Sequence, residues 1–182
     1  SNIKKLIKSL RDFSFSKECY KTEIGYLKIY KYEASKIKMP ETENPYLYLV
    51  IDVGLRLYTP YGIMDYISGQ YSIFEMDMPN FGYVISFSEH GDFLALSIEF
   101  TVDYIISVMI ELNENLIRKV MNLELSNESM VNADNNVVKS VSNLLSITKE
   151  KEQLEFLEKH IKKEIIFNCI CGSCGKNSYK VL

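Results

Sequence analysis

The stretch GQYSIFEMDMPNFGYVISFSEHGDFLALSIEF, residues 69–100, decides the fold. It contains short runs of β-branched and aromatic residues, and the breaks between them are rich in Gly, Pro, Asn and Asp. Such runs, bounded by turn residues, predict strands. Similar runs lie upstream from residue 25, and no helix-length segment separates them. The pattern therefore predicts an antiparallel barrel or sandwich over residues 25–100 rather than βαβ units.

On both sides of this segment the apolar residues follow a helical period. Residues 3–13 predict a short amphipathic helix, and Thr101 predicts the N-cap of a helix that follows the strands. Further helices are expected over 115–123, after Asp134, and over 149–171. The chain therefore divides into an N-terminal helix and lead-in (1–24), a β module (25–100), a helical segment (101–175) and a tail (176–182).

Composition and charge narrow the classes of function. Lys and Arg number 21 against 24 Asp and Glu, which gives a net charge of −3. A domain that binds duplex DNA alone normally carries a basic face, so this chain is not expected to bind DNA by itself. No apolar run reaches the roughly 18 residues of a membrane span, and no secretory signal is evident. The sequence predicts a cytoplasmic protein without a membrane contact.

Several short motifs occur in a characteristic order. They are Pro45 to Val50, Gly69-Gln70-Tyr71, Asp77-Met78-Pro79 and Leu94-Ala95-Leu96. In order and spacing they resemble the N-terminal domain of AraC-type transcription regulators, and Arg56 stands where that family usually has a basic residue. Downstream, Glu164 to Phe167 followed by Gly172 resembles the end of the family's last helix. The resemblance covers about residues 25–175.

The resemblance implies an α+β fold, an antiparallel cupin-like β-barrel followed by a helical dimerisation segment. In the family the barrel senses a small-molecule effector, and a C-terminal pair of helix-turn-helix motifs reads DNA. Residues 176–182 would begin the linker to that absent domain, so DNA would be bound only through it. The expected function is thus the effector-sensing, dimerising domain of a transcription regulator.

Tyrosines suggest where an effector would bind. The chain has 13 Tyr and no Trp, and many of the Tyr fall in the β module. A Tyr ring offers an apolar wall with a hydroxyl group, as a small-molecule pocket requires, although Tyr is also a common barrel-filling residue. The side chains expected to line the barrel are Tyr48, Tyr71, Glu75, Tyr83 and Ser97, with His90 at its mouth.

Other chemistry is less well supported by the sequence. The β module contains one His and no H-x-H pattern, and Cys171 and Cys174 form a single C-x-x-C pair. Neither supplies the ligand set of a zinc or cupin metal site, so no metal, cofactor or catalytic residue is predicted. Two alternatives stay open: a stand-alone cupin-like enzyme acting on a sugar or small organic acid, and an interaction domain with a solidly packed barrel.

The long helix predicted over 149–171 carries apolar residues on more than one side. Leu154, Leu157, Ile161 and Ile165 form one stripe, and Phe156 and Phe167 lie outside it. A helix of this kind needs two partners. The resemblance to a family of dimers implies that one partner is a second subunit, with Phe156 and Phe167 at the homodimer contact. The alternative cover is the helix after Asp134.

Overall fold

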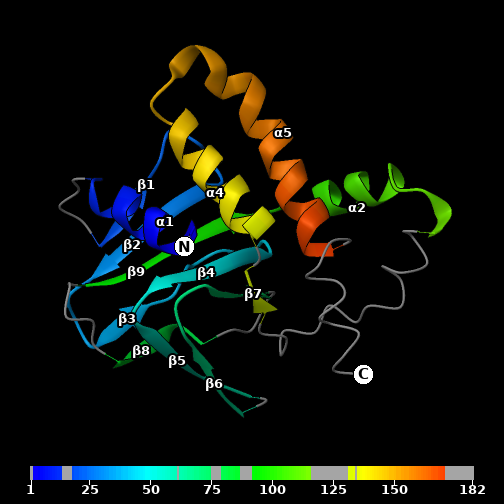
Figure 1. Ribbon diagram of the computed structural model, residues 1–182. Helices are drawn as coiled ribbons and strands as arrows, with labels where there is room; N and C mark the ends of the chain where they lie inside the picture. Colours follow the sequence, from blue (N-terminus) through cyan, green and yellow to red (C-terminus); the bar gives the residue numbers. More distant parts are fainter. Residues whose placement is uncertain are drawn as a thin grey trace.

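The computed structural model describes residues 2–13, 18–60, 62–74, 79–86, 92–115, 131–133 and 135–170 (Figure 1). Within these ranges the strands form two sheets, and every strand pair is antiparallel. The predicted antiparallel α+β architecture is confirmed. The first sheet has the order β1 (Cys19–Lys21), β2 (Leu27–Tyr32), β9 (Phe93–Glu99), β4 (Tyr46–Asp52), β7 (Gln70–Phe74) and β10 (Val131–Asn132). The second has the order β3 (Lys36–Lys38), β8 (Phe81–Ser86), β5 (Gly54–Thr59) and β6 (Gly62–Tyr66).

The sheets extend beyond the segment 25–100 that the sequence indicated. Strand β1 precedes it and pairs with β2. Strand β10 comes from a polar stretch between the predicted helices, where a loop was expected, and pairs with β7. Both are short edge strands, whose pairing depends on distant residues rather than on their own pattern.

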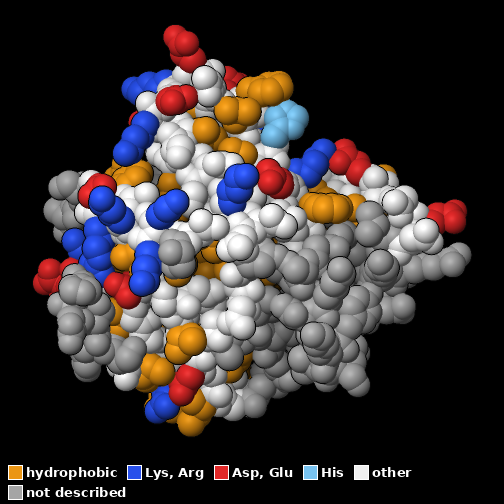
Figure 2. All heavy atoms as spheres, viewed as in Figure 1, with side chains coloured by type: hydrophobic (Ala, Val, Ile, Leu, Met, Phe, Trp, Pro, Cys, Tyr) orange, Lys and Arg blue, Asp and Glu red, His pale blue; other side chains and the backbone are white. Residues whose placement is uncertain are grey.

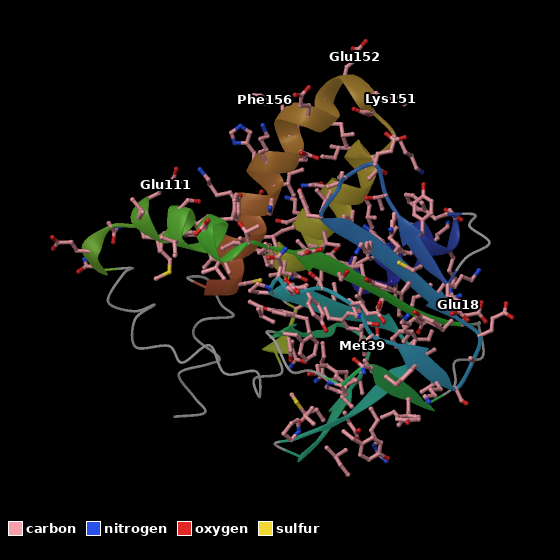
Figure 3. All side chains as sticks on the ribbon, turned by 180° about the vertical axis from the view of Figure 1, so that it is seen from behind. Glu18, Met39, Glu111, Lys151, Glu152 and Phe156 are labelled. Atoms are coloured by element: carbon pink, nitrogen blue, oxygen red, sulfur yellow. The ribbon has the colours of Figure 1, made fainter. Side chains whose placement is uncertain are left out.

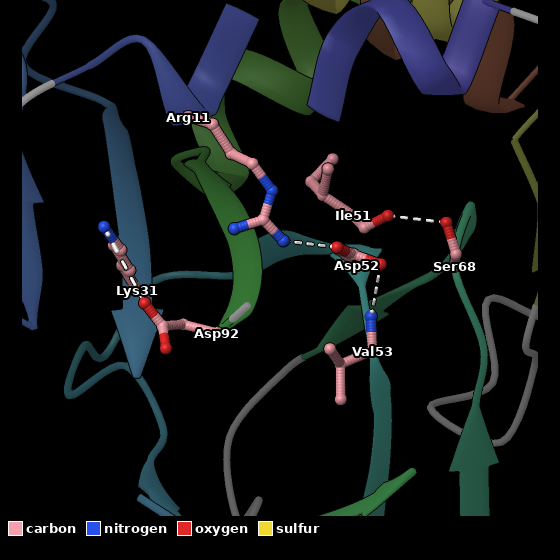
Figure 4. A network of polar contacts seen from close by, with 7 residues as sticks. All are labelled: Arg11, Lys31, Ile51, Asp52, Val53, Ser68 and Asp92. Atoms are coloured by element: carbon pink, nitrogen blue, oxygen red, sulfur yellow. Dashed lines mark hydrogen bonds and ion pairs between the residues drawn. The ribbon is translucent and has the colours of Figure 1, made fainter. Parts of the chain in front are cut away.

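The chain passes from one sheet to the other between β4 and β5. Val53 lies at the turn with φ of 71°, a conformation that β-branched residues rarely adopt. The Asp52 carboxylate accepts a hydrogen bond from the Val53 N–H (2.9 Å) and pairs with Arg11, as Figure 4 shows. Ser68 donates a hydrogen bond to the Ile51 carbonyl in the same region. This network ties the first helix to the bend that joins the two sheets.

The helices lie on the side of the six-stranded sheet that faces away from the second sheet (Figure 1). They are α1 (Asn2–Arg11), α2 (Val102–Ile110), α4 (Asn135–Ile147) and α5 (Lys151–Ile170). The predicted cap of α2 is confirmed, because the Tyr104 N–H donates to the Thr101 hydroxyl (3.1 Å). Most of the helix expected over 115–123, and the cap at Asp134, lie outside the described residues. Among those residues no helix is both long and apolar enough to span a membrane.

Strand β4 is apolar on both faces because it separates two cores. Successive side chains point to opposite faces of a strand. Leu47, Leu49 and Ile51 join the core under the helices, whereas Tyr46, Tyr48 and Val50 lie between the two sheets. The alternation therefore places Tyr46 and Tyr48 inside the barrel and the residues between them under the helices.

Candidate ligand-binding interior of the barrel

Aromatic side chains from several strands pack against one another between the two sheets. Strand β2 contributes Tyr30 and Tyr32, β4 contributes Tyr46 and Tyr48, and the rest come from β6, β7 and β9. Their ring centroids lie 5.4–6.4 Å apart, which is the favourable range for tilted and edge-on aromatic pairs. The full set of rings is Tyr30, Tyr32, Tyr46, Tyr48, Tyr66, Phe74 and Phe93.

The hydroxyls of this interior are unequally satisfied. Tyr30 shares a 2.9 Å hydrogen bond with Ser97, and Tyr66 shares one of the same length with Ser72. The hydroxyl of Tyr48 is fully buried and has no hydrogen-bond partner among the described residues. A buried polar group without a partner costs about 1–3 kcal/mol, so such a group calls for an explanation.

Burial keeps these phenols protonated. It raises the pKa of Tyr66 to about 12, with the hydrogen bond from Ser72 acting the other way. Burial likewise raises the pKa of Tyr32 to about 12 and that of Tyr48 well above its ordinary value. Among the residues that the structure describes, no Lys, Arg, Asp or Glu is fully buried. The interior therefore offers neutral hydroxyl groups within an aromatic lining.

Some of the residues expected to line the barrel face its interior, and others do not. Tyr48 and Ser97 do face the interior. Tyr71 faces the helices instead, because the residue opposite it on β4 is Leu49 and not Tyr48. Tyr83 lies on the outer surface and is 40% exposed. The inward orientation predicted for Tyr71 and Tyr83 is therefore wrong. Glu75 and His90 lie outside the described residues.

Four interior tyrosines, Tyr30, Tyr32, Tyr46 and Tyr66, were not among the residues expected to line the barrel. Tyr30 and Tyr32 alternate with Ile29 and Lys31 in the run LKIYKY, and Tyr66 ends β6. The alternation in β2 is a period-2 signal that would have placed Tyr30 and Tyr32 on one face. Tyr66 lies next to a turn, where the pattern is too short to assign a face.

Helix α5 is fixed to the barrel by a lysine held between two tyrosines. The Lys162 ammonium lies 4.1 Å from the ring centroid of Tyr104, on α2, and 4.7 Å from that of Tyr26, just before β2. The Tyr26 hydroxyl donates to the Glu158 carbonyl (2.6 Å). Burial lowers the pKa of Lys162, and the nearby Glu158 and Glu99 oppose this. Cation–π contacts of this kind contribute about 0.5–2 kcal/mol each.

The two phenylalanines expected at a dimer contact are exposed along α5. Helix α4 packs on one side of α5, where Ile161, Ile165 and Ile166 are buried, and so provides the alternative cover only in part. Phe156 is 70% exposed and Phe167 39% exposed. Both line a groove between α2 and α5, in two joined hollows of about 640 and 460 Å³ that share Glu111, His160 and Lys163. Figure 3 shows Phe156 and Glu111 on these two helices, and Figure 2 shows the histidine beside hydrophobic side chains there.

Three solved structures of similar fold have low sequence identity to this chain. ToxT from Vibrio cholerae matches with a TM-score of 0.56 and 12% identity over 84% of this chain and 56% of that chain. ToxT bound to (E)-4-(8-methylnaphthalen-1-yl)but-3-enoic acid matches with a TM-score of 0.54 and 12% identity, over 82% and 57%. ToxT bound to an unsaturated fatty acid matches with a TM-score of 0.50 and 9% identity, over 88% and 58%. The chain thus spans little more than half the length of these proteins.

Sequence comparison identifies the family. No curated protein sequence matches the chain at a significant level. The profile described as "AraC-type transcriptional regulator N-terminus" matches residues 23–177, which is most of the chain. The chain therefore belongs to the family of AraC-type transcriptional regulators, whose N-terminal domain it represents.

Proposed function

We propose that this domain senses a small effector inside the barrel and dimerises through its helical layer. The observation that carries the proposal is the buried Tyr48 hydroxyl without a partner among the described residues. A bound molecule with a hydrogen-bonding group would satisfy it, and the aromatic rings would cover an apolar body. The proposed ligand-contacting residues are Tyr48 and Ser97 together with Tyr30 and Tyr66. Glu75 as a lining residue and His90 at the mouth remain candidates.

The chemistry of the interior favours an amphiphilic effector. Neutral phenols can donate hydrogen bonds to a carboxyl, carbonyl or hydroxyl oxygen. The fold relative ToxT has been solved with an unsaturated fatty acid and with a naphthyl butenoic acid, both of which combine an apolar body with a carboxyl group. An effector of this class suits an uncharged aromatic interior with few polar groups.

The contacts of α5 provide a route from the barrel to the helices. Tyr30 lies in the interior on β2, and Tyr26, just before the same strand, is bonded to α5 and contacts Lys162. An effector that shifts β2 therefore changes how α5 is held, and so biases the arrangement of the dimer. The regulator would be cytoplasmic, and a part of it outside these 182 residues would bind DNA.

Native mass spectrometry with oleic acid as the probe tests effector binding. We expect one molecule of oleic acid per chain, because each barrel contains one Tyr48 hydroxyl, which has no partner among the described residues. Octane, which lacks a hydrogen-bonding group, serves as the control and should bind more weakly. No retained oleic acid, or several molecules per chain without a saturating stoichiometry, would contradict an interior site.

Replacing Phe156 by Glu is expected to remove the contact of α5 with a second subunit. Because Phe156 is 70% exposed, the charge should leave the fold intact. A contact of about −7 kcal/mol is mostly dissociated at about 1 µM protein and mostly formed at about 100 µM. In the unchanged protein the backbone amides of Lys151–Ile170 should therefore exchange more slowly at the higher concentration. Phe156→Glu should abolish this difference, as measured by hydrogen exchange. Lys151→Glu, an exposed change outside the groove, should preserve it. Exchange of α5 that is independent of concentration in the unchanged protein would contradict the dimer.

A further inference from the structure

The outer face of the four-stranded sheet is unusually apolar. Side chains that point away from the barrel are Tyr58 on β5, Ile63 on β6, Ile67 after it, and Phe81, Tyr83 and Ile85 on β8. We call these six residues, together with Arg56 and Asp65, the outer sheet face. The solvent side of an antiparallel sheet is normally polar, yet these six side chains are 38–62% exposed. Figure 2 shows hydrophobic atoms gathered around one basic and one acidic group where this sheet lies.

The size of this apolar surface matches one side of a stable protein interface. With aromatic and aliphatic side chains of roughly 150–250 Å² each, about half exposed, the face presents roughly 500 Å² of apolar area. That lies within the range of the largest patches found on monomers, which are often functional. A standard interface buries about 800 Å² per partner, of which a little more than half is apolar.

The charges of the outer sheet face indicate what kind of partner fits. Arg56 donates two hydrogen bonds to Asp65, of 2.7 and 2.8 Å, from neighbouring strands in direct register. These bonds lower the pKa of Asp65 and keep the pair ionised. The pair is neutral in sum, Lys38 on β3 pairs with Glu41, and the Lys36 ammonium lies 4.1 Å from the Phe81 ring centroid. One net positive charge falls short of the basic surface that nucleic acid or an anionic membrane requires. Because the two charges lie side by side, a twofold rotation can bring Arg56 of one copy opposite the partner's Asp65, and Asp65 opposite the partner's Arg56.

We propose that the outer sheet face binds a second copy of this chain in an isologous, face-to-face sheet contact. Arg56 of one copy then lies opposite the partner's Asp65, and the aromatic and aliphatic residues pack across the twofold axis. This contact is independent of the α2–α5 groove, because the four-stranded sheet lies at the end of the molecule away from α5 (Figures 1 and 3). Neither contact blocks the other.

Sedimentation equilibrium in the Phe156→Glu background isolates this contact from the one proposed for α5. At about 100 µM, a contact of about −7 kcal/mol is mostly formed, so Phe156→Glu protein should sediment as a dimer. Adding Ile63→Lys places a charge where the contact buries apolar surface, so it should weaken the association at least about tenfold. Adding Ile110→Lys is the matched control, since Ile110 is 75% exposed on α2, and it should leave the dimer intact.

A charge exchange tests whether the partner is a second copy. Arg56→Asp should weaken the dimer, and adding Asp65→Arg should restore it, because the exchanged pair remains complementary to itself. Circular dichroism should show that each variant is folded. A Phe156→Glu protein that is monomeric at about 100 µM, or a dimer that survives Ile63→Lys, would overturn the proposal. Either result leaves the hydrogen-exchange test of α5 unaffected.

Discussion

Replacing Phe74 by Ala should lower the free energy of unfolding by about 3–5 kcal/mol. Phe74 is fully buried, and its ring centroid lies 5.4 Å from that of Tyr46, 6.3 Å from Tyr48 and 6.2 Å from Tyr66. Its removal leaves a cavity bordered by rings from β4 and β6, and these rigid neighbouring rings cannot close it. Urea unfolding followed by circular dichroism measures the loss as a lower midpoint with an unchanged slope.

Phe156→Ala is the matched control for this change, since it removes the same side chain from an exposed site. It should alter the free energy of unfolding by less than about 0.5 kcal/mol when measured at low protein concentration. A loss of less than about 1 kcal/mol for Phe74→Ala would show that the aromatic rings of the interior are not closely packed.

Gly82→Ala should cost about 1–3 kcal/mol because the site has no room for a methyl group. A Cβ at Gly82 would lie 2.6 Å from Leu55 Cδ1 and 3.0 Å from Leu57 Cδ2. Both leucines are fully buried between the sheets and cannot turn away without displacing other side chains. A lower thermal or urea midpoint measures the effect.

Gly25→Ala provides the comparison for Gly82→Ala. A Cβ at Gly25 meets no atom within 4 Å, and its φ is not in the left-handed region. This change should therefore be neutral or raise the free energy of unfolding by at most about 1 kcal/mol, because Ala reduces the conformational entropy of the unfolded chain. Equal effects at the two glycines would contradict the close approach of β8 to β5.

Most strands and helices of this domain could be predicted from local patterns, but the faces of several side chains could not. Tyr48 and Tyr71 illustrate the difference. Tyr48 pairs with Ser72 and Leu49 with Tyr71, so a shift of one residue in register would exchange which tyrosine enters the barrel. In β4 every residue is apolar from Tyr46 to Ile51, and such a run carries no period to fix the register.

Long-range pairing also explains the elements that were missed. The run that contains β4 and β5 is continuous in the sequence, and the break at Val53 depends on a positive φ that its residue type disfavours. Strand β10 has two residues and exists because Val131 meets Tyr71 and Asn132 meets Gln70. The unpartnered hydroxyl of Tyr48 becomes visible only when all its neighbours are placed, as does the outer position of Tyr83.

Titration calorimetry of oleic acid into the unchanged protein and the Tyr48→Phe variant tests effector sensing most directly. Tyr48→Phe removes a hydroxyl that has no partner among the described residues, so the variant should remain folded without ligand. Tyr83→Phe makes the same change on the outer surface and serves as the control. We predict that Tyr48→Phe weakens binding about tenfold, the equivalent of one buried hydrogen bond of about 1.4 kcal/mol, and that Tyr83→Phe does not. Equal affinities in all three proteins, or no binding to the unchanged protein, would contradict an effector site in the barrel.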